Sequence, residues 1–117
     1  MNPKKIIERG DIIYVDFDPS VGHEMNYNRP AMVISPSSFN LFSNIILVCP
    51  LTTKPKGSPW EVEMPSGMKT KGVIRVDHLK SIDKSRCEMH HHRIVIKETL
   101  PAALIEEILA RLGPLVT

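Results

Sequence analysis

The stretch "DIIYVDFDPSVGHEMNYNRPAMVIS", Asp11 to Ser35, contains two short apolar runs with a long polar segment between them. Ile12–Phe17 and Ala31–Ser35 are rich in β-branched residues and predict two buried strands. Strands that pair directly usually need only about two to five linking residues. The link from Asp18 to Arg29 is much longer, and long loops in small domains are more often functional than decorative. We therefore expect this loop to belong to a functional site.

Apolar runs of the same kind recur along the chain and predict further strands. The segment "WEVEM" alternates, so Trp60, Val62 and Met64 are expected to face inward. Glu61 and Glu63 are then expected to face outward. The segments with a strand pattern are Ile45–Leu51, Trp60–Met64, Val73–Leu79 and, more weakly, Arg86–Ile96.

The connector "SPSSFNLFS", residues 35–43, is expected to hold a single helical turn. Ser37 or Ser38 would cap this turn, because a serine side chain can accept a backbone N–H at a helix start. Phe39 and Phe42 are three positions apart and are expected to turn inward together.

Near the C-terminus the apolar period changes to that of an amphipathic helix. Thr99 and Pro101 suit its start, and Gly113-Pro114 suits its end. Its apolar positions are Leu104, Ile105, Ile108, Leu109 and Leu112. Several short strands followed by one helix, without βαβ alternation, predict a mainly β (α+β) fold, a small antiparallel barrel or curled sheet with a helical appendage. We expect one domain over residues 1–117.

The composition is that of an ordinary globular domain, with 42% hydrophobic and 24% charged residues, which argues against disorder. A formal net charge of +2 is compatible with a nucleic-acid ligand but does not indicate one. The N-terminal segment has no long apolar run, so neither a signal peptide nor a membrane span is expected. Cys49 and Cys87 are expected to be free thiols of a cytoplasmic protein.

The long loop carries three side chains of chemical interest, His23, Glu24 and Arg29. Solvated loop polarity would account for them. However, Pro30 restricts the backbone of Arg29 to an extended geometry, which fixes the guanidinium at the mouth of a strand. A fixed guanidinium offers a planar fork for a phosphate group.

Two further places put polar groups at or near strands. If Val73–Leu79 is a strand, Arg75 and Asp77 share one face, either as an exposed ion pair or as a proton acceptor beside a phosphate-stabilising cation. "LTTK", Leu51 to Lys54, ends an apolar strand with two hydroxyls and an ammonium. Such hydroxyls make local hydrogen bonds or donate to a phosphate oxygen.

The triplet His90–His92 is the only sequence feature suggestive of a metal site. In a strand, His90 and His92 would share a face, but zinc needs further ligands, and Cys87 is the only nearby candidate. We expect no native metal and no other cofactor.

Four stretches stand in a specific order along the chain: "ERGDIIYVDFDPSVGHEMNYNRPAMVISPSSFN", "VCPLTTKPKGSPWEVEM", "GVIRVDHLKSIDKS" and "EEILARLGPL". In this order and spacing they resemble the MazF/PemK family of toxin endoribonucleases, from Arg9 to Leu115. The resemblance implies an SH3-like barrel that forms a homodimer. It also implies metal-independent cleavage of single-stranded RNA, held in check by a cognate antitoxin.

The resemblance also implies site residues. The catalytic pair of the MazF branch falls on Arg29 and Thr52. The set proposed for the PemK (Kid) branch falls on His23, Arg75 and Asp77, and this chain carries both sets. It departs from the family at His78, where Gln is usual, which bears on the RNA sequence that is preferred.

Cleavage of RNA without a metal requires the neighbouring 2′-OH to become the nucleophile, which yields a 2′,3′-cyclic phosphate and a 5′-OH. Asp77 or Glu24 would take the proton, because carboxylates are ionised near neutral pH. Arg29 and Arg75 would stabilise charge on the phosphate. Thr52 and His23 would hold the phosphate. The residues expected to contact RNA are Asn28, Thr53, Lys54, Lys56, His78, Lys80 and Ser81.

An acidic, disordered antitoxin segment is expected to cover the same groove, because such a segment can mimic an RNA backbone. Two other classes of protein remain open at this level: a CcdB-like toxin that blocks DNA gyrase, and a non-catalytic RNA-binding module. Fold alone does not separate the three classes. The grouping of base, arginine and hydroxyl candidates favours the enzyme.

Overall fold

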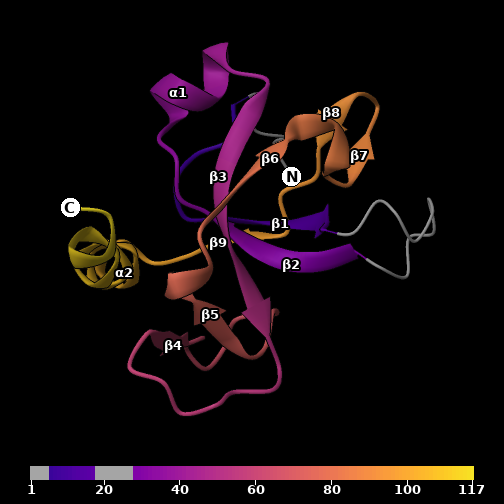
Figure 1. Cartoon of the computed structure of the whole chain (residues 1–117). Coiled ribbons are helices and arrows are strands. Elements are labelled where there is room, and N and C mark those ends of the chain that lie inside the picture. The colour runs from indigo at the N-terminus through magenta and orange to yellow at the C-terminus, as the bar shows by residue number, and fades with distance from the viewer. Residues whose placement is uncertain (1–5, 18–27) are drawn as a thin grey trace.

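Most strands of the protein lie in one antiparallel sheet, seen in a computed structural model that describes residues 6–17 and 28–117 (Figure 1). The strands are β1 (Asp11–Asp16), β2 (Asn28–Val33), β3 (Ile45–Thr52), β4 (Glu61–Glu63), β5 (Val73–Arg75), β6 (Lys80–Asp83), β7 (Met89–His90), β8 (Arg93–Ile94) and β9 (Glu98–Thr99). The helices are α1 (Ser37–Phe42) and α2 (Ala102–Val116). The expected mainly β fold with a C-terminal helix is confirmed.

The long strand β3 organises the sheet. One of its edges pairs with β2, and the other pairs with β6 near its start and with β5 near its end. The strand order is β4-β5-β3-β2-β1-β9, and β7 and β8 form a separate hairpin. Both apolar runs form strands, as predicted, and these strands, β1 and β2, pair directly. β2 begins at Asn28, so the connecting segment is slightly shorter than expected.

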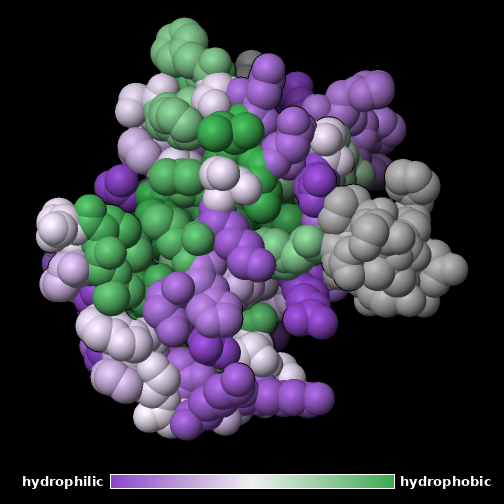
Figure 2. Space-filling model, viewed as in Figure 1, coloured by the Kyte–Doolittle hydropathy of each residue, from purple (hydrophilic) through white to green (hydrophobic). Residues whose placement is uncertain are grey.

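The two faces of the sheet carry separate apolar clusters, as the alternation of side chains along strands requires. The cluster on the helix side contains Ile12, Met32, Ile34, Cys49, Leu51, Val62, Met64, Ile74, Val76, Leu100, Ile108 and Leu112. The cluster on the opposite face contains Ile7, Ile13, Val15, Ala31, Val33, Ile46, Val48, Ile82 and Cys87. Helix α2 covers the first face through its buried Ile108 and Leu112. Figure 2 shows apolar side chains gathered over α2 and the adjoining sheet.

β9 closes the free edge of β1 and joins two distant parts of the chain. Asp11 and Thr99 are register partners, and the hydroxyl of Thr99 donates to the buried Asp11 carboxylate at 2.7 Å. The amides of Lys97 and Leu100 donate to the carbonyls of Ile12 and Gly10. The N-terminal strand is therefore held by the segment that leads into α2.

Helix α1 differs from expectation in its cap and in its buried side. Pro36 is its N-cap, and neither predicted serine caps it. Phe39 and Phe42 are 40% and 87% exposed, whereas Asn40 is buried. The Asn40 side chain donates to the carbonyls of Ile7 and Ser35, both at 2.9 Å. These buried hydrogen bonds decide which side of the short helix faces the protein.

Helix α2 continues through Gly113 and Pro114, where an end was expected. A proline removes one i→i−4 hydrogen bond, here the one to the carbonyl of Ala110. The last turn still closes, because the amide and the hydroxyl of Thr117 both donate to the carbonyl of Gly113.

The predicted strand Val73–Leu79 ends early, at Arg75, and residues Val76–His78 form a 3₁₀ turn. The amide of Val76 donates to the carbonyl of Trp60 at 2.9 Å, and its side chain is fully buried in the helix-side cluster. This hydrogen bond continues the β4–β5 register by one pair, and the backbone turns only after it, at Asp77, a residue of low strand propensity. Arg75 and Asp77 therefore do not share a strand face.

The weak strand prediction for residues 86–96 is also corrected. Residues 89–94 form the β7–β8 hairpin, with His91 and His92 at positive φ in its turn. The three histidines are exposed and do not alternate along one strand. Cys87 and Cys49 are buried free thiols, as expected, and burial raises the pKa of each to about 12.

Among the described residues, neither helix is long and apolar enough to span a bilayer.

Candidate active site

Arg29, Thr52 and Arg75 project from the same face of the sheet, the one opposite α2. Arg29 is the register partner of Val15, which belongs to the cluster on that face. Side chains alternate along a strand, so Thr52 lies on the same face as Val48. Cross-strand partners share a face, so Val73, the partner of Thr52, lies there too. Arg75, two positions further along β5, follows Val73 on that face. The polar residues thus begin where this apolar cluster ends.

A pocket of about 320 Å³ gathers one group of the expected residues. Its described lining is Arg29, Pro30, Leu51, Thr52, Thr53, Lys54 and Lys71. Two hydroxyls and three cations supply its side-chain polar groups, and no acidic residue from the described ranges 6–17 and 28–117 lines it. Such a lining suits an anion that carries several oxygens.

Lys71 is a member of this pocket that the sequence analysis missed. Thr52 pairs with Val73, so continuing the same antiparallel register brings Lys71 opposite Lys54. The approach depends on Gly72, which has φ +111°, and a Cβ there would overlap the carbonyl oxygen of Thr52. The sequence signal was available, in a glycine just before the "VIR" strand that pairs with "LTT".

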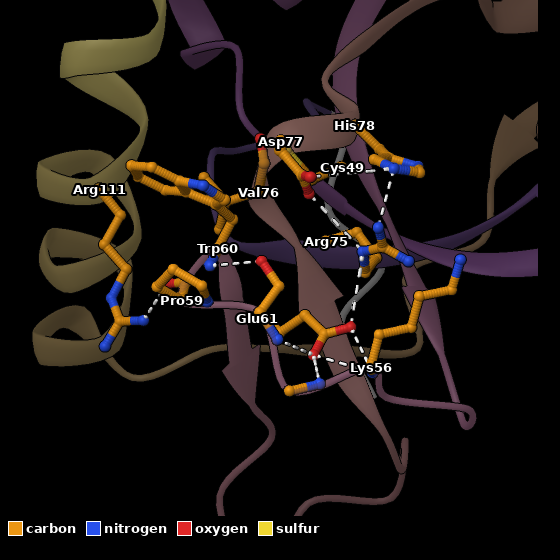
Figure 3. Close-up of polar contacts among 12 residues, drawn as sticks. Cys49, Lys56, Pro59, Trp60, Glu61, Arg75, Val76, Asp77, His78 and Arg111 are labelled. Carbon is orange, nitrogen blue, oxygen red and sulfur yellow. Dashed lines mark hydrogen bonds and ion pairs between the residues drawn. The ribbon is translucent and has the colours of Figure 1, made fainter.

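A second cluster surrounds Arg75, one strand away on β5 (Figure 3). Its Nε lies 3.7 Å from Oε2 of Glu61 and 3.6 Å from Oδ1 of Asp77. Nη2 lies 2.9 Å from Nε2 of His78, which accepts the hydrogen bond because a guanidinium can only donate. The Arg75 side chain is 14% exposed, and its Nε is buried without a hydrogen-bond partner among the described residues.

Glu61 was expected to face outward, but its side chain is only 4% exposed. Its carboxylate accepts the backbone N–H groups of Lys56, Gly57 and Ser58 at 2.8–3.1 Å. The hydrogen bond from Lys56, those from Ser58 and Gly57, and the nearby Arg75 charge together lower the pKa of Glu61 below its ordinary value of 4.5. Glu61 is thus an ionised anchor for the loop that precedes β4, a role that strand alternation does not reveal.

The structure separates the remaining expected RNA contacts. Asn28 stands at the start of β2 opposite Asp16, and the ammonium of Lys80 lies 5.5 Å from the ring centroid of Phe17. Ser81 pairs with Leu47, whose side chain packs on the helix-side cluster, so Ser81 points to the α2 side.

His23 and Glu24 lie outside the described residues, as does most of the long loop, residues 18–27.

The histidine triplet does not build a recognisable metal site. Over the described ranges, no group of three or more His, Cys, Asp or Glu side chains is placed to hold a metal ion. Cys87 is buried, whereas His90–His92 are exposed on the hairpin.

A curled antiparallel sheet with one covering helix and, on its other side, a pocket lined by hydroxyls and cations is a small β fold with a site suited to an anionic ligand. A family described as PemK-like, MazF-like toxin of type II toxin-antitoxin system matches residues 8–116. The chain belongs to this family.

Sequence relatives agree with this assignment. The chain is 43% identical over 82 residues to the endoribonuclease toxin MazF of Escherichia coli K12, which covers 70% of this chain and 73% of that protein. It is 31% identical over 119 residues to the endoribonuclease PemK of Escherichia coli, covering 97% and 85%.

Solved structures show the same fold. MazF from Deinococcus radiodurans superposes with a TM-score of 0.78 at 32% identity, covering 97% of this chain and 98% of the other. A MazE–MazF complex from the same organism matches with a TM-score of 0.77 at 29% identity, covering 97% of both chains.

Proposed function

We propose that residues 1–117 form the toxin of a type II toxin–antitoxin system, a metal-independent endoribonuclease that cuts single-stranded RNA at a preferred sequence in the cytoplasm. The observation that carries this proposal is the pocket in which Arg29 and Thr52 meet Lys54 and Lys71. Sequence relatives that are named endoribonucleases support the same activity.

In the proposed reaction, the scissile phosphate occupies this pocket. The hydroxyl of Thr52 donates to a phosphate oxygen, and Arg29 stabilises the negative charge that grows as the 2′-OH attacks phosphorus. Lys54 and Lys71 hold neighbouring phosphates of the strand. The bond to the 5′-oxygen breaks, and the departing oxygen takes a proton from solvent water, with the guanidinium of Arg29 or Arg75 as the less favoured donor. The products carry a 2′,3′-cyclic phosphate and a 5′-OH.

The proton of the 2′-OH passes to a carboxylate, Asp77 or Glu24. Asp77 lies beside Arg75, so a candidate for proton uptake and a candidate for charge stabilisation stand next to each other. His23 steadies the phosphate from the long loop. Asn28, Thr53, Lys56, His78 and Lys80 are proposed to contact the RNA on either side of the cut. Ser81 is left out of this set, because its side chain points to the α2 side.

Two protein partners follow from the family. The solved complex named MazE–MazF supports a cognate antitoxin, which we propose lays an acidic segment across the cations of the pocket. We also propose a homodimer, because large apolar side chains are exposed on α1 and at the end of α2. These residues are Phe39, Leu41, Phe42, Leu115 and Val116. Sedimentation that gives a monomer at micromolar concentration would contradict the dimer.

The decisive experiment sequences the 5′ ends of RNA cut by the pure protein and identifies the product termini. We expect a common sequence at the cuts, 2′,3′-cyclic phosphate and 5′-OH ends, and an unchanged rate in EDTA. RNA with a 2′-deoxy sugar at the cut should bind and remain whole. A 5′-phosphate product, or activity restored only by a divalent ion, would overturn the proposal. Inhibition of DNA gyrase without RNA cleavage would favour the CcdB-like alternative.

A further inference from the structure

We propose that Glu61 is a positioning residue for RNA cleavage, which fixes the guanidinium of Arg75 and at the same time folds the loop that carries Lys56. This inference rests on the proposed endoribonuclease function. Glu61 has no role in the reaction proposed for this site, and it is not among the described residues that line the phosphate pocket.

The carboxylate of Glu61 holds the loop before β4 through backbone hydrogen bonds. Oε1 of Glu61 accepts the amides of Lys56, Gly57 and Ser58 at 3.1, 2.8 and 3.1 Å, and Oε2 accepts that of Lys56 at 2.9 Å. Three successive amides converge on one carboxylate because Gly57 adopts φ +79°. The amide of Glu61 in turn donates to the carbonyl of Ser58 at 3.1 Å. The loop therefore has its shape because an anion stands at position 61.

The same carboxylate lies beside Arg75, which is the direct cross-strand partner of Glu61. Figure 3 shows the Glu61 carboxylate between the loop and the guanidinium. The buried Nε of Arg75 has a carboxylate on each side, Glu61 and Asp77, at 3.7 and 3.6 Å. A guanidinium with little solvent contact needs compensating negative charge. Without Glu61, the negative charge beside Arg75 would come from Asp77 alone. The Arg75 guanidinium and the Asp77 carboxylate would then leave their present positions.

Replacement of Glu61 by glutamine separates its contact with the loop from its contact with Arg75. In Glu61→Gln the remaining oxygen can still accept loop amides, whereas the new NH₂ group would oppose the Nε–H of Arg75. In Glu61→Ala both contacts vanish. Glu63→Gln is the matched control, because Glu63 lies on the same strand and face but is exposed and pairs with Val73.

The test measures single-turnover cleavage of a short RNA, together with KM and kcat, for wild type and for these three variants. We expect Glu61→Gln to lower kcat by about 10- to 100-fold, the range for a displaced catalytic group, with KM changed less than about threefold. Glu61→Ala should lower kcat similarly and also raise KM. Glu63→Gln should match wild type. In an Arg75→Ala background, Glu61→Gln should cost less than about twofold more, because residues that act through one another are not additive.

Amide hydrogen exchange gives a readout that is independent of RNA cleavage. The amides of Lys56, Gly57 and Ser58 should exchange at least about tenfold faster in Glu61→Ala than in wild type or Glu63→Gln. If Glu61→Ala does not fold, the Glu61→Gln comparison decides.

Two results would overturn the inference while wild type still cuts RNA. One is a normal kcat in Glu61→Gln; the other is a loss of kcat in the Glu61→Gln, Arg75→Ala double variant equal to the product of the two single losses. Failure of wild type and Glu63→Gln to cut RNA would instead overturn the proposed function, and the inference with it.

Discussion

The two arginine sites on the face of the sheet opposite α2 differ in how their charge is balanced. Around Arg29, the described pocket lining supplies hydroxyls and further cations. Around Arg75, two carboxylates and an imidazole lie within 4 Å or less of the guanidinium. The first site is built to receive an anion from outside, whereas the second already holds its counter-charges. One sheet face thus carries a pocket lined by hydroxyls and cations and, on the neighbouring strand, a cluster of charged side chains that are already paired with one another.

The largest effect is expected at the phosphate pocket. Arg29→Ala and Thr52→Ala should each slow RNA cleavage by about 10²–10⁴-fold, because each removes a group that we propose contacts the reacting phosphate. Binding of an uncleavable 2′-deoxy RNA should weaken far less. Single-turnover cleavage and equilibrium binding measure the two quantities, with Arg93→Ala on β8 as an arginine control. Rates within a few-fold of wild type would make this pocket a binding surface only.

The next effect separates Asp77 from its neighbour Arg75. Asp77→Asn keeps the shape of the 3₁₀ turn but removes the candidate base, so we expect cleavage to slow by about 10²-fold. Single-turnover rates at constant pH, compared with Glu61→Gln, provide the check. If the cleavage rate falls by the same small factor in both variants, Asp77 only positions Arg75, and another residue is the base.

A smaller effect is expected from Lys71, at the rim of the pocket. Lys71→Ala should raise the Kd for RNA by about threefold to tenfold. The slope of log Kd against log salt should fall by about the amount that one phosphate contact contributes. Lys69→Ala is the control, since that exposed lysine lies two positions earlier and outside the pocket. Equal losses in both variants would show a diffuse charge effect. The salt series should be measured with uncleavable RNA.

The smallest effect concerns stability and pH at the second site. Because the folded-state pKa of Glu61 lies below its ordinary value of 4.5, its ionised form favours folding. That contribution is fully present above the unfolded pKa and is lost as the pH falls through the lower folded-state pKa. Wild type should therefore exceed Glu61→Gln in denaturant midpoint at pH 7, and the gap should narrow below pH 4.5. A gap that is constant with pH would assign the difference to shape rather than charge.

The strands could be predicted because their signal is local. Apolar, β-branched runs between turn residues located β1, β2 and β3 to within three residues, and the change of period located α2. The errors arose where distant groups decide. α1 turns Asn40 inward because that side chain donates to the buried carbonyls of Ile7 and Ser35. β5 ends at Arg75 although the apolar alternation continues to Val76.

The candidate site divides in the same way. Arg29 and Thr52 were singled out from the sequence, and the structure brings them into one pocket. Lys71 was missed because its position depends on the β3–β5 register and on the close approach at Gly72. Glu61 was assigned to solvent because strand alternation gives the face of a side chain but not what covers it.

The pairing of β1 with β9 has a consequence for how the chain is made. Asp11 and Thr99, which share a buried hydrogen bond, are 88 positions apart, and the helix-side cluster needs Ile108 and Leu112 from α2. During synthesis, the ribosome therefore releases most of the sheet before its edge and one of its faces can be covered. Stalled nascent chains that end before β9 are expected to stay sensitive to protease. The β1 edge and the helix-side face are therefore completed only after residues 98–112 have been translated.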